Sequence, residues 1–466
     1  MRYLLLVTAL LATPAFAATG NDAWHAKARE LFEHAVEIPT VAGRGRVPEL
    51  AQYLADQYKA AGWAADDIHV MPYEGNPGDK TAALIVRWPA GGAAKAKPIM
   101  LMAHMDVVEA KAEDWSLDPF TLTEKDGYYY GRGTSDDKMG VVSVTTALLQ
   151  LKAKGFKPRR DIIVFFTGDE ETGGHGAKLG ATQWKPMLDA EYGLNADGGG
   201  GSFAPGNRPL GFTFQTAEKT YADYAFTTHN AGGHSSKPRP DNAIYQLSTA
   251  LTQLGHYRFE PALNATTRAY FSERQKSEPG ALGDAMRAWL KNPADGAAAD
   301  AIEADAGEVG LTRTRCVATM LTGGHAPNAL PQMARATVNC RILPGVSPDA
   351  IRDELQKIAG DKVEVTRLDD AAASLDSPLR TDVLQAYTQS VHARFPTSPV
   401  IPEMSTGASD ARPFRVAGIP VYGTNGGWTV TPVDNRAHGK DERLPVQSLY
   451  DNVVHWELML RDLAGK

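Results

Sequence analysis

A histidine and an aspartate follow one apolar run of this chain at a spacing that suits metal chemistry. The apolar segment 98–103 runs directly into His104, and Asp106 lies two residues further on. If 98–103 is a strand, alternate side chains share a face, so both residues point the same way at its C-terminal end. A carboxylate beside an imidazole fixes the tautomer of a metal-binding ring. We therefore expect His104 to bind metal and Asp106 to orient it.

Three further segments bring acidic residues to comparable positions. The C-terminal ends of parallel strands collect at one edge of a sheet, where ligand sites form. Uncompensated carboxylates gathered there would repel one another, and bound cations are the simplest compensation. The acidic residues are Asp136 and Asp137 in a glycine-bounded loop, Glu170 and Glu171 after the apolar segment 161–167, and Asp197 after the segment 192–196.

A second imidazole, His438, lies in the C-terminal part of the chain. Histidine and carboxylate ligands together suit zinc, and they tolerate cobalt or manganese. One bridging carboxylate would hold two ions about 3.5–4 Å apart, as in two-metal hydrolases. Of the adjacent Glu170 and Glu171, one can bind metal while the other takes a proton from the attacking water. The residues thus predict a hydrolytic centre with two Zn²⁺ ions.

Such a centre requires a scaffold in which several strands end at the same edge. Short, continuous apolar strands separated by helical segments are typical of a mostly parallel sheet with helices on both faces. We therefore predict an α/β core. Its expected strands are 81–88, 98–103, 161–167 and 192–196, and its expected helices are 26–36, 47–61 and 139–154.

After about residue 211 the pattern changes to that of a second layer. The expected order is strand, helix, strand, strand, helix, strand, which is the order of a ferredoxin-like α+β domain. We interpret it as an inserted lid or dimerisation domain, followed by a return to the core. The predicted division is a signal peptide at 1–17, a discontinuous catalytic domain at 18–211 and 373–466, and the lid at 212–372 with a helical insertion at 255–310.

The N-terminus has the features of an export signal. Arg2 precedes the apolar run 3–11, and Ala15-Phe16-Ala17 has the small-x-small form of a signal-peptidase site, with the cut after Ala17. The apolar run is too short to span a bilayer. We expect a periplasmic or secreted protein without a membrane span. The net charge of −7 provides no basic field for a nucleic-acid partner.

The two cysteines, Cys316 and Cys340, lie in two expected strands, 316–321 and 334–342. Export would expose them to oxidising conditions. They either form a cross-strand disulfide or stay as two buried thiols, because the sequence does not show how closely their Cα atoms approach.

Taken together, these motifs resemble the zinc exopeptidase family of glutamate carboxypeptidase, carnosinase-type dipeptidases, acetylornithine deacetylase, succinyl-diaminopimelate desuccinylase and the aminoacylases. The likeness covers nearly the whole chain after residue 17. It implies that Asp137 supports the site without binding metal. It further implies that His104 and Asp197 bind the first metal, and that Glu171 and His438 bind the second. Asp136 would then bridge both metals. Asp106 would orient His104, and Glu170 would be the general base.

The same resemblance assigns residues outside the metal centre. His234, in Gly-Gly-His-Ser-Ser, resembles a lid histidine that polarises the scissile carbonyl. It would act in the neighbouring subunit if the lid forms a homodimer, and in its own subunit otherwise. Asn328 and Arg341 resemble substrate-binding groups, and Arg341 would grip a carboxylate through paired hydrogen bonds. Gly407 resembles a contact to the substrate backbone.

The expected reaction is hydrolysis of a peptide bond in dipeptides or at the C-terminus of short peptides. An N-acyl-amino-acid deacylase would use the same site, and the sequence does not separate the two. The expected partner is accordingly a small peptide or an N-acyl amino acid. A non-catalytic metal- or peptide-binding scaffold is disfavoured, because a binding protein has no use for an unligated base such as Glu170.

Overall fold

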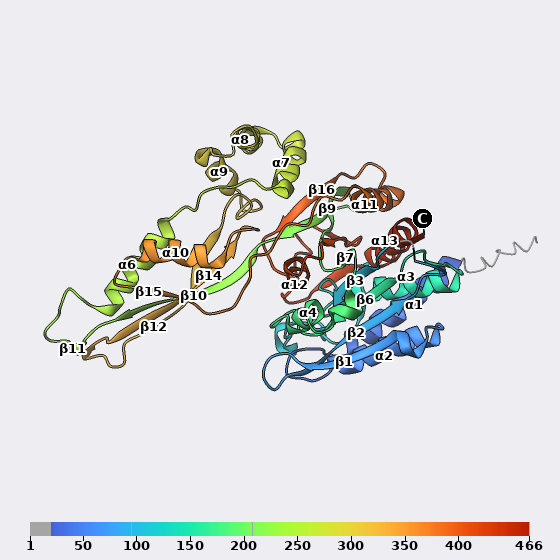
Figure 1. The fold of residues 1–466 in the computed structure, drawn as a ribbon, viewed down its shortest axis with the longest axis horizontal. Helices are drawn as coiled ribbons and strands as arrows, with labels where there is room; N and C mark the ends of the chain where they lie inside the picture. Colours follow the sequence, from blue (N-terminus) through green and yellow to red (C-terminus); the bar gives the residue numbers. More distant parts are fainter. Residues whose placement is uncertain (1–19, 95, 207, 466) are drawn as a thin grey trace, which may run out of the picture.

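The computed structural model describes residues 20–94, 96–206 and 208–465, so the expected signal peptide at 1–17 lies outside the described residues. The described chain forms a large body and a long arm that projects from it (Figure 1). A ten-stranded sheet runs through the body, and a four-stranded sheet runs along the arm.

The body is built on the large sheet. Three strand pairs at its centre are parallel, and the outer pairs on one side are antiparallel. In sheet order the strands are β1 (Ile68–Glu74), β2 (Lys80–Trp88), β6 (Ile162–Thr167), β3 (Ile99–His104), β7 (Tyr192–Asn195), β17 (Val421–Gly423), β9 (Arg208–Glu218), β8 (Gly200–Ala204) and β18 (Trp428–Val430), with β16 (Val400–Ser405) paired to β9.

Helices cover both faces of this sheet, because its central strands are apolar on both sides. In β3, the buried Leu101 packs into the core on one face and the buried Met102 into the core on the other. The predicted α/β core is confirmed. The first face carries α1 (Gly20–Glu37), α2 (Val47–Ala60), α3 (Lys138–Ala153), α11 (Thr381–Arg394) and α13 (Val446–Gly465), and the second α4 (His175–Ala181), α5 (Lys185–Leu188) and α12 (Ala411–Val416).

The arm has the predicted ferredoxin-like order, in which two helices alternate with four antiparallel strands. Its helices are α6 (Ala243–His256) and α10 (Pro348–Ala359). A short pair of strands, β11 (Gly233–His234) and β13 (Ala329–Leu330), also belongs to the arm. In sheet order its four strands are β12 (Arg315–Gly323), β14 (Met333–Ile342), β10 (Thr220–His229) and β15 (Glu364–Arg367).

Three helices lie between α6 and β12, in the segment expected to be a helical insertion. They are α7 (Ala265–Ser277), α8 (Gly280–Lys291) and α9 (Gly296–Glu303). Phe271, Met286 and Trp289 form their shared core, and Met404 of β16 belongs to the same buried cluster. The three helices therefore pack on the body next to the base of the arm (Figure 1).

A disulfide links two neighbouring strands of the arm. Cys316 of β12 lies opposite Cys340 of β14, and the structure joins them in a disulfide. No helix among the described residues has both the length and the apolar content needed to cross a membrane.

The remaining elements are small. They are two 3-10 helices, Ala65–Asp67 and Ala112–Asp114, and a three-stranded sheet of β19 (Arg443–Pro445), β5 (Tyr128–Tyr130) and β4 (Thr123–Lys125).

Candidate metal centre

His104 is the last residue of β3 and is 1% exposed. Its Nδ1 lies 3.0 Å from the carbonyl oxygen of Asp106 and 3.6 Å from the Asp106 carboxylate. Because Nδ1–H donates to that carbonyl, the lone pair of a neutral ring is on Nε2. Nε2 lies 3.1 Å from Oδ1 of Asp136, so the ring presents its ligand atom to the acidic cluster.

The Asp106 carboxylate also positions a neighbouring loop. It accepts hydrogen bonds from the backbone N–H of Glu170, at 3.1 Å, and of Glu171, at 3.0 Å. These two glutamates follow β6, which lies beside β3 in the sheet. Asp106 therefore supports His104 from one side and holds both glutamates on the other.

Asp136 joins the two imidazoles. Its Oδ1 lies 3.1 Å from His104 Nε2, and its Oδ2 lies 3.1 Å from His438 Nε2. Glu171 approaches His438 Nε2 to 2.9 Å, and Asp197 lies 3.8 Å from His104 Nε2. A carboxylate with one oxygen toward each imidazole has the arrangement of a bridging ligand between two ions.

The donor atoms are close enough to hold metal. In the group of His104, Asp136 and Glu171, one ligand atom from each residue lies within 4.8 Å of the others, and the same holds for His104, Asp137 and Asp197. Imidazole nitrogen and carboxylate oxygen are ligands that zinc accepts. The residues present thus fit a metal centre. The two groups include four of the five ligands predicted from the sequence, and the fifth, His438, lies beside Asp136 and Glu171.

The electrostatics of the cluster also favour bound cations. Burial raises the pKa of Asp197 well above its ordinary value. Burial would also raise the pKa of Asp136, but hydrogen bonds from His104 and His438 hold it below the usual range. The hydrogen bonds that His438 donates, first to Asp136 and then to Glu171, raise the pKa of its ring to about 10. The carboxylates therefore hold positive charge between them, which divalent ions bound to the same atoms would supply.

Glu170 differs from its neighbour. Burial raises the pKa of its carboxyl group well above the ordinary value. Whereas Glu171 contacts His438, no hydrogen bond or ion pair joins the Glu170 carboxylate to another residue within the described part of the chain. It lines a cavity of about 500 Å³ on the side of the cluster that faces the base of the arm.

Arg341 and Gly407 line this same cavity, so the structure brings two of the three predicted substrate-binding residues next to the cluster. Lys178 and Arg412 add further positive charge to its wall. We call this space the cationic cavity. Its lining includes Glu170, Glu171, Lys178, Tyr221, Arg341, Gly407, Asp410, Arg412 and His438.

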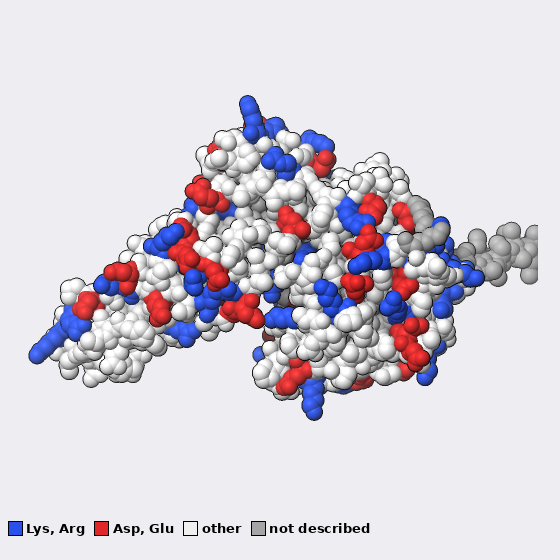
Figure 2. Space-filling model, viewed as in Figure 1, with Lys and Arg blue, Asp and Glu red and all other residues white. Residues whose placement is uncertain are grey.

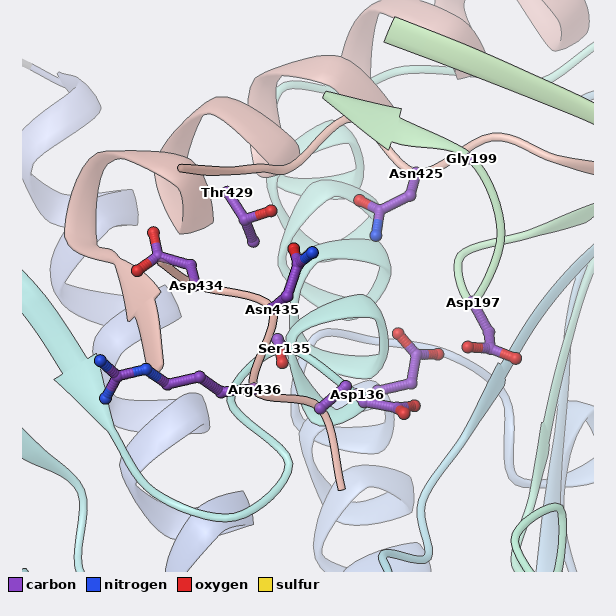
Figure 3. Close-up of a pocket in the computed structure, with 11 residues that line it drawn as sticks. Ser135, Asp136, Asp197, Gly199, Asn425, Thr429, Asp434, Asn435 and Arg436 are labelled. Atoms are coloured by element: carbon purple, nitrogen blue, oxygen red, sulfur yellow. The ribbon is translucent and has the colours of Figure 1, made fainter. Parts of the chain in front are cut away.

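A second cavity, of about 410 Å³, lies against the cluster on the side of Asp136 and Asp197 (Figure 3). Asp136 and Asp197 contribute to its wall, and the remaining lining comes mostly from the loops that follow β17 and β18. Uncharged polar side chains, those of Asn425, Thr429 and Asn435, face its interior. We call this space the amide cavity.

His234 and Asn328 lie elsewhere. They are neighbours, since the N–H of Ser235 donates to the carbonyl of Asn328 at 3.0 Å and β11 pairs with β13. Figure 1 shows β11 at the outer end of the arm, whereas the strands that carry the acidic cluster lie in the body. The structure therefore does not bring His234 or Asn328 to the metal centre of their own chain.

Sequence reasoning gave no role to Glu442, which organises the loop before α3. Its side chain is fully buried and accepts a hydrogen bond from Arg132 Nη1 at 2.6 Å. The same carboxylate accepts the backbone N–H of Ser135, at 2.8 Å, and of Asp136, at 3.2 Å. In the sequence, its position four residues after the predicted ligand His438 was the feature that could have indicated a role at the site. Glu442 thus links the segment of one predicted ligand to the loop of another.

Asp410 and Asp169 were also assigned no role. Asp410 is buried and accepts a hydrogen bond from the Thr167 hydroxyl at the end of β6; burial raises its pKa to about 7. Asp169 accepts the Tyr73 hydroxyl at 2.6 Å and the backbone N–H of His175 at 2.7 Å. Both carboxylates fix the segments on either side of Glu170 and Glu171.

The role of Glu442 can be tested by Glu442→Gln, which keeps the shape of the side chain and removes its charge. Because Arg132 would then be buried without a counter-charge, we expect a loss of about 3–5 kcal/mol of stability. Thermal unfolding of the metal-stripped protein measures this loss. The matched control is Glu364→Gln at an exposed position of β15, and equal midpoints for the two variants would contradict the role.

Comparison with known proteins agrees with this geometry. The model of Peptidase family M20/M25/M40 matches residues 100–462. One relative is the N-fatty-acyl-amino acid synthase/hydrolase PM20D1 of Xenopus tropicalis, which is 28% identical over 369 residues, covering 76% of this chain and 70% of that protein.

Solved structures share the fold across nearly the whole chain. The M20 family metallo-carboxypeptidase Sso-CP2 from Sulfolobus solfataricus superposes with a TM-score of 0.69 at 19% identity, covering 94% of this chain and 99% of that one. The YXEP protein of Bacillus subtilis, described as a dinuclear metal binding peptidase, gives 0.57 at 11% identity, covering 95% and 99%. Since the family match includes every residue of the acidic cluster, this chain belongs to the M20/M25/M40 peptidase family and is a metallohydrolase of that family.

Proposed function

We propose that this protein is an exported two-zinc hydrolase that cuts peptide bonds in dipeptides or at the C-terminus of short peptides. One observation carries the proposal: Glu171 is engaged with His438, whereas the adjacent Glu170 carboxylate faces a cavity without a partner among the described residues. Ligand binding alone would not require the second glutamate. A hydrolase requires it as a base.

The metal would be held by the cluster described above. His104 and Asp197 would bind one ion, and Glu171 and His438 the other. Asp136 would bridge them, and Asp137 would support the loop. Bound zinc would lower the pKa of a water molecule and polarise the scissile carbonyl.

The residues of the chain then divide the remaining work. Glu170 takes the proton of the attacking water and passes it to the leaving amine. Asp106 keeps His104 and the Glu170 loop in place through the contacts measured above. Arg341, with Lys178 and Arg412 nearby, offers positive charge for a carboxylate on the leaving half of the substrate. Gly407 leaves room for the substrate backbone, and Asn328 of the partner subunit would add a substrate contact.

A second candidate is hydrolysis of N-acyl amino acids. It would use the same base, the same ligands and the same carboxylate recognition, and only the acyl half of the substrate would differ. The likeness to PM20D1, whose name describes an N-fatty-acyl-amino acid synthase/hydrolase, favours this candidate.

Export and a working lid are part of the proposal. The disulfide between Cys316 and Cys340 supports an oxidising compartment, periplasmic or extracellular. The segment 212–372 would act as a lid over the catalytic parts 18–211 and 373–466, because it contributes Arg341 to the cationic cavity.

We also propose a homodimer formed through the arm. Strand β12 is an edge strand, and it exposes Val317 at 60%, Met320 at 66% and Leu321 at 67%. Figure 2 shows an uncharged area along the lower side of the outer end of the arm, whereas charged side chains lie at its tip and along its upper side. Exposed apolar edge strands favour pairing with another chain. A partner arm would carry His234 and Asn328 to a second chain.

The general base can be tested with Glu170→Gln. Because the variant lacks a proton acceptor and keeps every predicted ligand, we expect kcat/KM for dipeptides to fall by about 10²–10⁴-fold or more. The zinc content, measured by mass spectrometry of the metal, should stay that of the parent. The matched control is Glu171→Gln, which should lose zinc. Full activity of Glu170→Gln, or no hydrolysis by the zinc-loaded parent, would refute the proposal.

The dimer can be tested with two inactive variants, His234→Ala and Glu170→Gln, carried by differently tagged chains and purified as a mixed pair. If His234 acts across a two-fold interface, one of the two sites combines the native Glu170 of one chain with the native His234 of the other. Activity should therefore return to about half that of the parent. Each variant purified alone is the control. A monomer in light scattering, or a mixed pair as inactive as its controls, would exclude the shared site.

A further inference from the structure

The two cavities beside the metal cluster have different chemistry, and the proposed function uses only the cationic one. A substrate amide held at the cluster has two halves that point in opposite directions. If its leaving half extends toward Arg341, its acyl half extends past Asp136 and Asp197 into the amide cavity. The residues of the amide cavity would then decide which acyl groups the enzyme accepts.

The wall of this cavity includes a firmly held loop, residues 424–427 between β17 and β18. Gly426 packs directly on the buried His455, where an added Cβ would lie 2.0 Å from the ring. The loop therefore has little freedom to move or to carry larger side chains. Its hydrogen bonds run from Thr424 N to Asn195 O (2.8 Å), Asn425 N to Gly198 O (2.8 Å), Gly426 N to Asn452 Oδ1 (2.9 Å), His455 Nε2 to Thr424 O (2.9 Å) and the Tyr387 hydroxyl to Asn425 O (2.8 Å).

Asn425 presents a defined donor to the cavity. Its side-chain oxygen accepts the backbone N–H of Gly427 at 2.7 Å, which fixes the orientation of the amide. The Nδ2 group consequently faces the cavity, as Figure 3 shows, and it donates to no other residue in the described parts of the chain. A donor placed in this way is ready to bind an oxygen atom of a ligand.

Two more polar groups face the same space. The hydroxyl of Thr429 and the amide of Asn435 point into it from the opposite side (Figure 3), and neither side chain has a hydrogen-bond partner within 20–94, 96–206 or 208–465. The charged neighbour Asp434 is engaged elsewhere, since it accepts Arg443 at 2.7 Å and the N–H of Val430 at 2.8 Å. Arg436 is also engaged, because it donates to the carbonyls of Val433 at 3.0 Å and Asp441 at 3.2 Å. Apart from the carboxylates of the metal cluster, the free groups of the wall are thus uncharged donors and acceptors.

We propose that the amide cavity is the subsite for the acyl half of the substrate, and that Asn425, Thr429 and Asn435 select an aminoacyl residue with hydrogen-bonding groups over an aliphatic acyl chain. The inference rests on the proposed function and makes it narrower. An aliphatic chain in this cavity would displace water from polar groups and leave them unpaired, at a cost of about 1–3 kcal/mol for each group. An aminoacyl residue supplies partners for them.

The experiment uses the zinc-loaded full-length mature protein and three substrates that share a leucine leaving half. Their acyl halves are seryl, which is small and polar, butanoyl, which is small and apolar, and dodecanoyl. Because the leaving half is constant, contacts to Arg341 cancel in the comparison. The parent should favour seryl-leucine over both acyl-leucines by at least about tenfold in kcat/KM, the equivalent of one lost hydrogen-bonding group.

The variants are Thr429→Val, which keeps the shape of the side chain, and Asn425→Leu. Each should reduce that preference about tenfold, mainly by slowing hydrolysis of seryl-leucine. Thr252→Val, at an exposed position of α6 on the arm, is the matched control and should leave the preference unchanged.

The outcomes separate the two proposals. If the parent cuts none of the three substrates, the proposed function fails and this inference fails with it. If the parent cuts them but prefers an aliphatic acyl group, or if Thr429→Val and Asn425→Leu both keep the preference of the parent, the subsite assignment is wrong and the hydrolase stands.

Discussion

One carboxylate placed between two imidazoles is the interaction on which the site depends. The oxygens of Asp136 lie 3.1 Å from Nε2 of His104 and 3.1 Å from Nε2 of His438, which come from distant parts of the sequence. Burying several carboxylates together is unfavourable unless positive charge accompanies them. The surrounding structure supplies the means: Glu442 anchors the loop of Asp136, and Asp106 anchors the loop of Glu170 and Glu171.

The two ends of the site differ in their chemistry. The cationic cavity lies on the side of Glu170 and Arg341, and the amide cavity lies on the side of Asp197 and Asn425. A substrate that spans the cluster therefore meets positive charge at one end and uncharged hydrogen-bonding groups at the other. The cationic end depends on the arm, because Arg341 belongs to β14, whereas the amide end is built by loops of the body.

Much of the core could be predicted from the sequence because its strands are unbroken apolar runs. The segments 98–103 and 161–167 became β3 and β6, and the helix expected at 139–154 became α3, with bounds that differ by at most one residue. Short strands such as β5 and β18 were missed, since three residues carry no periodicity.

The site was partly predictable for a similar reason. His104 is the last residue of β3, and the acidic residues Glu170, Glu171 and Asp197 follow β6 and β7, so their place at the sheet edge follows from the topology. Glu442 could not be found in this way, because its importance comes from being buried against Arg132. Nor could Asn425, whose donor faces a cavity only because its oxygen is held by Gly427. The remote position of His234 depends on the length and direction of the arm.

The central claim is that Asp136 bridges two metal ions, and a crystal of the zinc-loaded protein measured at the zinc absorption edge tests it most directly. The account predicts two anomalous peaks about 3.5–4 Å apart. One should lie against His104 and Asp197, the other against Glu171 and His438, and an oxygen of Asp136 should contact each. A single peak at full zinc occupancy, or two peaks that do not share Asp136, would contradict it.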